Sequence, residues 1–317
     1  MRVGADLQMD FAGGFPTAPD GFTFPLARLR TAMVRLTSPS TTIAAGQDTP
    51  FFSPLNPTSL ASLAVPAFAY SGNLWTWVPQ ARVERRVSVG SASTLLLQGG
   101  IMDPLTGDVP YLQYFRVPQA GEQSRQPAYA SRVAWSRQVR GGDLTVGAGG
   151  YYSRQHWGFN RSSDAWAGTS DWTVPFNSRV EVSGEFYYGR GIGGLGGGFG
   201  RSIVSSGSIT DAGTIIHPLN STGGWTQVKL RQTEKLEWNG AFGLDNVRSR
   251  DLRRFPIAVQ PYYDPTIGRN RSSFVNFIYR PRSDVLMSVE YRRFRTFRIY
   301  GESESADQLS LNMGVLF

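Results

Sequence analysis

Apolar and polar side chains alternate with a period of two along most of this sequence, and the last stretch of the chain shows it most clearly. Apolar residues at positions 309, 311, 313, 315 and 317 are separated by Gln308, Ser310, Asn312 and Gly314. Successive side chains of a β-strand point to opposite faces, so this stretch predicts a strand with one apolar and one polar face. Residues 2–11 alternate in the same way. We therefore expect an all-β protein.

The connections between the predicted strands alternate between short and long. Short turns are predicted near residues 38, 90, 141, 176, 234 and 281, and longer loops at 13–25, 48–73, 102–127, 154–162, 189–223, 245–268 and 295–305. A soluble β-sandwich also has alternating strands, but nothing requires this order of connections. Bacterial outer-membrane barrels have short periplasmic turns, longer external loops and an even strand number. The pattern predicts one domain over residues 1–317, a transmembrane antiparallel β-barrel of about 14 strands.

The composition agrees with a barrel. Charged residues make up 18% of the chain, below the usual quarter of a soluble domain, and Gly 36 and Pro 19 supply turns. Aromatic residues near strand ends are expected to form interfacial girdles. They are Phe11, Trp75, Trp77, Trp135, Tyr152, Trp172, Tyr188, Trp225, Tyr279, Tyr291 and Phe317. The terminal Phe317 resembles the barrel-assembly signal of outer-membrane proteins, which predicts the outer-membrane assembly machinery as a partner.

The charge distribution and the absence of cysteine argue against several other functional classes of protein. The net charge is +8, but only Lys229 and Lys235 are lysines, and arginines recur within strands beside acids instead of clustering. This distribution does not predict nucleic-acid binding. The absence of cysteine excludes disulfides, thiolate metal sites and a cysteine nucleophile. No cofactor or metal is expected.

Residues 48–73 form the most unusual predicted loop. The loop contains four prolines and the apolar segment from Leu60 to Val65. So apolar a loop is expected to fold onto another part of the protein. We expect it to fold inward against the barrel wall and to narrow the pore.

Charged side chains occupy the polar phase of several predicted strands, which faces the lumen if the apolar phase meets lipid. The candidate pore-lining and substrate-binding residues are Arg82, Glu84, Arg86, Arg132, Lys229, Arg231 and Arg292. Rings of basic residues favour anions, and a guanidinium group can bind a carboxylate through two hydrogen bonds. Alternatively, these cations brace the wall by pairing with Glu84, Glu181, Glu185, Glu237 and Glu290. We expect these cations to serve both roles, and most of them to brace the wall.

The stretches Thr42–Phe51 and Trp75–Glu84 resemble the DcaP-like outer-membrane porins, a family of trimeric channels. The first contains the Ala-Gly-Gln entry, and in the second Pro79, Gln80 and Arg82 match the family's run and Thr76-Trp77-Val78 replace an expected arginine. The resemblance implies sixteen strands, a homotrimer and passive uptake of small solutes such as dicarboxylates. Met1 and Arg2 run directly into a strand pattern, and the resemblance implies that about two strands and a signal peptide lie upstream of Met1.

The resulting expectation is a non-enzymatic porin of the bacterial outer membrane, in contact with its lipid and lipopolysaccharide, that conducts small, preferentially anionic solutes. Two alternatives stay open. One is a structural or binding barrel plugged by its loops. The other is a barrel phospholipase using a Ser-His pair, for which His156 and His217 are the only histidines; both are expected in loops, and no serine motif accompanies His156.

Overall fold

Fourteen antiparallel strands form one continuous sheet in the computed structural model, which describes residues 1–11, 27–62, 65–107, 117–256 and 265–316. Each strand pairs with the next one in this series: β1 (Arg2–Asp10), β2 (Arg28–Thr37), β3 (Thr41–Asp48), β4 (Val78–Val89), β5 (Ser93–Met102), β6 (Ala128–Val139), β7 (Gly142–His156), β8 (Ser162–Pro175), β9 (Val180–Arg190), β12 (Asn220–Arg231), β13 (Leu236–Val247), β14 (Ile267–Arg282), β15 (Val285–Arg298) and β16 (Glu304–Val315). This confirms the all-β barrel with about 14 strands.

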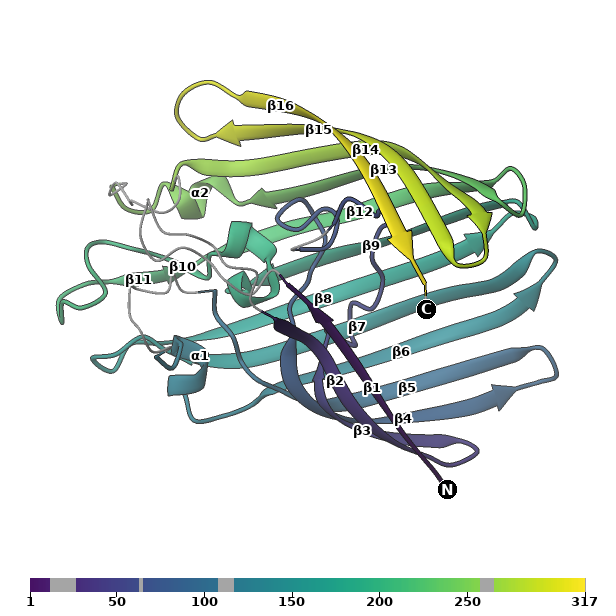
Figure 1. Cartoon of the computed structure of the whole chain (residues 1–317). Coiled ribbons are helices and arrows are strands. Elements are labelled where there is room, and N and C mark those ends of the chain that lie inside the picture. The colour runs from purple at the N-terminus through teal and green to yellow at the C-terminus, as the bar shows by residue number, and fades with distance from the viewer. Residues whose placement is uncertain (12–26, 63–64, 108–116, 257–264, 317) are drawn as a thin grey trace.

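Figure 1 shows the sheet rolled around an interior segment, with β1 and β16 as its two edge strands. Among the described residues no hydrogen-bonded pairing joins these two strands. The remaining elements lie in the connections. They are α1 (Ala120–Gln123), α2 (Ser249–Leu252), two short 3-10 helices at Gly193–Leu195 and Gly197–Gly200, and a small hairpin of β10 (Ile203–Ser205) and β11 (Ile216–Pro218).

The period of two places apolar side chains on the outer face of the sheet. Val275, Tyr291 and Leu311 are exposed, whereas their neighbours along the strands, such as Asn276 and Glu290, are buried on the inner face. A sheet with an apolar outside and a polar inside is inverted relative to a soluble barrel, as a lipid-facing wall requires.

Some predicted boundaries are wrong. The loops expected at 154–162 and 295–305 are only five residues long, because β7 continues to His156 and β15 continues to Arg298. The hairpin of β10 and β11 was not predicted. The loop expected at 13–25 and the terminal Phe317 lie outside the described residues.

Three predicted girdle aromatics are not on the outer face. Trp75 and Trp77 precede β4, which begins at Val78, and Trp225 is buried on the inner face of β12. Four of the others are exposed there, namely Tyr152, Tyr188, Tyr279 and Tyr291. No helix within the described ranges is both long and apolar enough to cross a membrane.

Candidate functional site

In the connection between β3 and β4, the described residues 49–62 and 65–77 lie along the inner face of the sheet, and we call them the inner loop (Figure 1). Phe52 is fully buried and stacks on Tyr151 of β7, with 5.4 Å between ring centroids. The carbonyl of Phe52 accepts a 2.6 Å hydrogen bond from Thr169 of β8. Further along, Phe68 packs on Phe274 of β14 at 5.1 Å. Apolar contacts therefore hold the inner loop to both halves of the wall.

Buried polar side chains of the wall anchor the part of the loop between these aromatic contacts. Glu185 of β9 accepts hydrogen bonds from the Ser53 hydroxyl at 2.8 Å and from the Leu55 backbone N–H at 2.7 Å. Gln227 of β12 accepts one from the Thr58 backbone N–H at 2.6 Å. A buried backbone group needs such a partner, so these wall residues determine the path of the loop.

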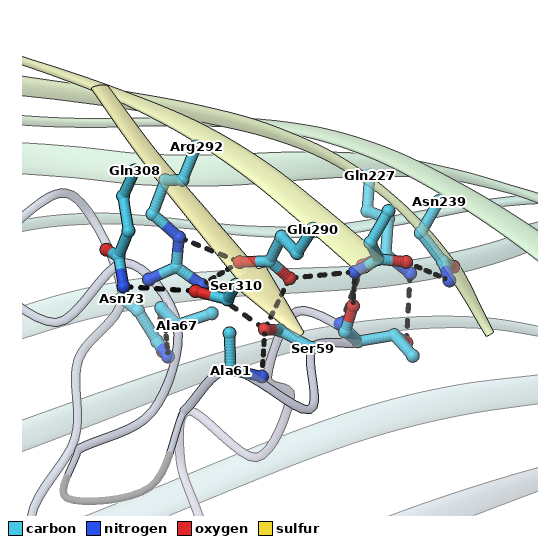
Figure 2. A network of polar contacts seen from close by, with 12 residues as sticks. Ser59, Ala61, Ala67, Asn73, Gln227, Asn239, Glu290, Arg292, Gln308 and Ser310 are labelled. Carbon is cyan, nitrogen blue, oxygen red and sulfur yellow. Dashed lines mark hydrogen bonds and ion pairs between the residues drawn. The ribbon is translucent and has the colours of Figure 1, made fainter. Parts of the chain in front are cut away.

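Glu290 of β15 is the third anchor, shown in Figure 2. It accepts a 2.6 Å hydrogen bond from Ser59 and a 2.9 Å hydrogen bond from Asn276, and it pairs with Arg292 at 2.5 Å. Asn276 also donates to the Thr58 carbonyl at 2.9 Å. The three anchors come from β9, β12 and β15, so the inner loop spans several strands of the wall.

Gly72 marks the closest approach of the loop to the wall. Its φ is +108°, a conformation that favours glycine, and a Cβ there would lie 2.1 Å from the carbonyl oxygen of Gly224 and 2.5 Å from that of Leu244. These carbonyls belong to β12 and β13, so the loop backbone touches the strand backbones directly.

Most of the sequence-predicted site residues are ion-paired on the inner face. Arg82 is buried and contacts Asp48 at 3.1 Å and Glu84 at 2.7 Å. Arg132 is also buried and binds Asp171 through two hydrogen bonds of 2.9 and 2.6 Å. In both cases the acid satisfies the guanidinium group, which fits the bracing role.

The remaining predicted cations are more accessible. Lys229 lies 3.8 Å from Glu237, and Arg231 lies 3.3 Å from Glu181 with 40% of its side chain exposed. Arg292 is held by Glu290, as described. Arg86 is exposed on the same strand phase as Arg82, and within the described ranges it forms no ion pair. Of the predicted site residues, Arg86 and Arg231 are therefore the cations open to a solute.

Sequence reasoning placed Glu185 in the wrong role. Among the described residues it pairs with no arginine, because both of its oxygens accept hydrogen bonds from the inner loop. Gln227 and Asn276 were not singled out at all. Their position on the inward phase of β12 and β14 was the available signal, since a buried amide there needs a partner in the lumen.

The two histidines do not lie in loops as expected. His156 ends β7, and its Nδ1 lies 3.3 Å from the Ser162 hydroxyl at the start of β8. Within the described ranges no carboxylate bonds to His156, and the nearby Asp164 is held by Arg154 and Tyr152. Among these described residues, the pair of His156 and Ser162 has no carboxylate in the place of the third group of a catalytic triad. His217 lies in β11, 3.3 Å from Asp251.

No protein-family model matches this sequence, and no curated protein matches it. Among solved structures, the outer membrane channel DcaP of Acinetobacter baumannii aligns with a TM-score of 0.67 and 16% identity, covering 98% of this chain and 79% of that one. OprB of Pseudomonas putida aligns with a TM-score of 0.55 and 12% identity, over 92% of this chain and 73% of that one.

An anion-selective porin from Comamonas acidovorans aligns with a TM-score of 0.52 and 9% identity, over 90% of this chain and 78% of that one. At these identities the likeness concerns the fold. The resemblance to the DcaP-like porins is confirmed at that level, and the chain has the transmembrane β-barrel fold of outer-membrane porins.

Proposed function

We propose that this protein is a porin of the bacterial outer membrane, through which small hydrophilic, preferentially anionic solutes diffuse passively. The observation that carries the proposal is the inner loop, held by Glu185, Gln227 and Glu290 along the inner face of a lipid-facing wall. A loop attached to several strands of the wall occupies part of the lumen and so reduces its cross-section. We infer that residues 48–73 act as the constriction.

The preference for anions rests on the balance of charges. The chain carries 32 basic and 24 acidic residues. On the inner face, Asp48, Glu84, Asp171 and Glu290 are each paired with an arginine, which cancels their attraction for cations. Arg86 is exposed, and Arg231 keeps 40% of its side chain exposed although it pairs with Glu181, so both guanidinium groups are accessible to a carboxylate. Dicarboxylates are therefore a solute class that this lumen would accept.

Uptake by liposomes tests the solute class. Vesicles containing the purified protein should swell faster in succinate than in an uncharged solute of similar size. The double variant Arg86→Gln/Arg231→Gln should lose this difference. Arg282→Gln is the matched control, because Arg282 is 76% exposed at the turn between β14 and β15. Equal swelling in both solutes for the unmodified protein would refute the anion preference.

The proposed assembly is a homotrimer in the outer membrane. The structure of one chain supports it through the fold shared with porins. Crosslinking of intact cells followed by denaturing electrophoresis would show a species of three chains, and a single chain at every crosslinker concentration would refute it.

A further inference from the structure

Three arginines surround one phenylalanine at the loop end of β14 and β15. The guanidinium carbons of Arg269, Arg271 and Arg295 lie 5.2, 5.1 and 4.8 Å from the ring centroid of Phe297. Arg269 is directly opposite Phe297 in the strand register, and Arg271 is directly opposite Arg295. We call these four residues the arginine cluster. The ring face attracts cations and fixes the three guanidinium groups close together.

The arginine cluster lies on the outer face of the wall. Arg269 and Arg271 share the phase of the exposed Val275, and Arg295 and Phe297 share that of the exposed Tyr291. Arg295 lies ten residue steps after Val285 in β15, about 33 Å along the strand. Because barrel strands are tilted, this length corresponds to about 25 Å along the membrane normal, which is the height of the apolar band. The cluster therefore begins where the acyl chains end on the long-loop side.

Among the described residues, the positive charge of the arginine cluster is not balanced by ion pairs with neighbouring carboxylates. Like charges directly opposite on one face of a sheet destabilise the pair, and Arg271 and Arg295 have this arrangement. Within the described ranges none of the three arginines is ion-paired, and the Arg271 Nε–H is buried without a hydrogen-bond partner. By contrast, the buried Arg82 and Arg132 of the inner face each pair with a carboxylate. An anion outside the protein is needed to balance the cluster.

We propose that the arginine cluster binds the phosphate groups of a phosphorylated glycolipid in the outer leaflet, whose acyl chains lie along the apolar band below. Only an anion anchored in the membrane has its charge at this height and its apolar part against Val275 and Tyr291. Guanidinium groups suit this ligand because they bind phosphate oxygens through paired hydrogen bonds. This inference rests on the proposed placement in the outer membrane.

Native mass spectrometry of the full chain in detergent, titrated with bisphosphorylated lipid A, tests the site. The double variant Arg271→Gln/Arg295→Gln should bind lipid A at least tenfold more weakly than the unmodified protein. Phe297→Leu should weaken binding by a few fold, because the guanidinium groups lose the ring that holds them. Arg282→Gln, at the opposite end of the strand, should bind normally. Lipid A stripped of its phosphates should bind the unmodified protein and the double variant equally.

Three results would overturn the proposal. One is equal binding of lipid A by the unmodified protein and the double variant. Another is complete displacement of lipid A by 10 mM inorganic phosphate, which would make the cluster a site for free anions. The third is loss of oligomers in the double variant with unchanged lipid binding, which would assign the cluster to a second copy of the chain. Swelling measured on the same preparations tests the porin function separately, because the cluster does not face the lumen.

Discussion

Arg132 and Asp171 form the most completely buried ion pair on the inner face, with side-chain exposures of 7% and 2%. Breaking such a pair by removing one partner leaves a buried charge without compensation, which costs about 3–5 kcal/mol. Arg132→Ala should therefore lower the free energy of unfolding by roughly that amount. Urea unfolding in lipid vesicles, followed by tryptophan fluorescence, would measure it.

The double variant Arg132→Met/Asp171→Leu is the matched control for this pair. Because it removes both charges and keeps the volume, it should recover most of the lost stability. If both variants were equally unstable, the loss would come from packing and not from the unpaired charge.

For single residues, the sequence predicts the face of the sheet on which a side chain lies better than it predicts the residue that this side chain contacts. Alternation placed Arg82, Arg132 and Arg292 on the inner face, where Arg82 and Arg132 are buried and the Arg292 side chain is 11% exposed. It could not predict that Glu185 binds the inner loop, because Ser53 lies 132 residues away in the chain and only the rolled sheet brings the two together. The arginine cluster was missed because residues 295–305 were predicted to be a loop, although Arg295 and Phe297 continue the alternation of β15.

Among the elements, the inner loop depends on backbone contact at Gly72. A Cβ at this position meets the carbonyl oxygens of Gly224 and Leu244, and the φ of +108° adds strain. Gly72→Ala should detach this part of the loop and raise the channel conductance, with a loss of stability of about 1–3 kcal/mol. Gly213→Ala is the control, because nothing lies within 4 Å of its added Cβ. An unchanged conductance in Gly72→Ala would show that the loop does not limit the pore.

The connection carrying α2 is fixed to β12 by one carboxylate. Asp251 accepts hydrogen bonds from the backbone N–H of Asn220 at 3.0 Å and from its side-chain amide at 2.7 Å. Burial alone would raise the pKa of Asp251, but the hydrogen bonds from Asn220 and His217 outweigh it and lower the pKa from the ordinary 3.8. The ionised form is therefore the one that holds the connection.

A depressed pKa gives stability that is fully present above pH 3.8 and is lost as the pH falls through the folded-state value. The protection of the Asn220 and Leu252 amides against hydrogen exchange, corrected for intrinsic rates, should be constant above pH 4 and fall below it. In Asp251→Asn it should be low throughout and independent of pH. A decrease already at pH 5 in the unmodified protein would contradict the assignment to Asp251.

The positions of strands and turns can be predicted from the sequence wherever apolar and polar residues alternate. Five of the six short turns were predicted at the positions observed, because each separates two runs with a period of two, whereas the turn predicted near residue 281 lies at 283–284, after β14 ends. The hairpin of β10 and β11 was not, since its strands have three residues each within a segment rich in glycine and serine. Such a hairpin is determined by packing of the loops, as when the Leu219 N–H donates to the Ser202 carbonyl at 2.9 Å.

On the scale of the whole molecule, the two faces of the sheet have different functions. The outer face presents an apolar band with the arginine cluster at its loop end, and the inner face holds the inner loop through buried acids and amides. The period of two makes both faces from the same strands. The fold class was predictable for this reason, whereas the path of the inner loop required the structure.

The central claim is that the molecule is an anion-preferring channel, and the most direct test is to record currents from single molecules in a planar bilayer under a salt gradient. The account predicts discrete conductance steps and a reversal potential with the sign of anion selectivity, reduced in Arg86→Gln/Arg231→Gln and unchanged in Arg282→Gln. A correctly folded protein that conducts nothing, or a reversal potential with the sign of cation selectivity, would contradict the account.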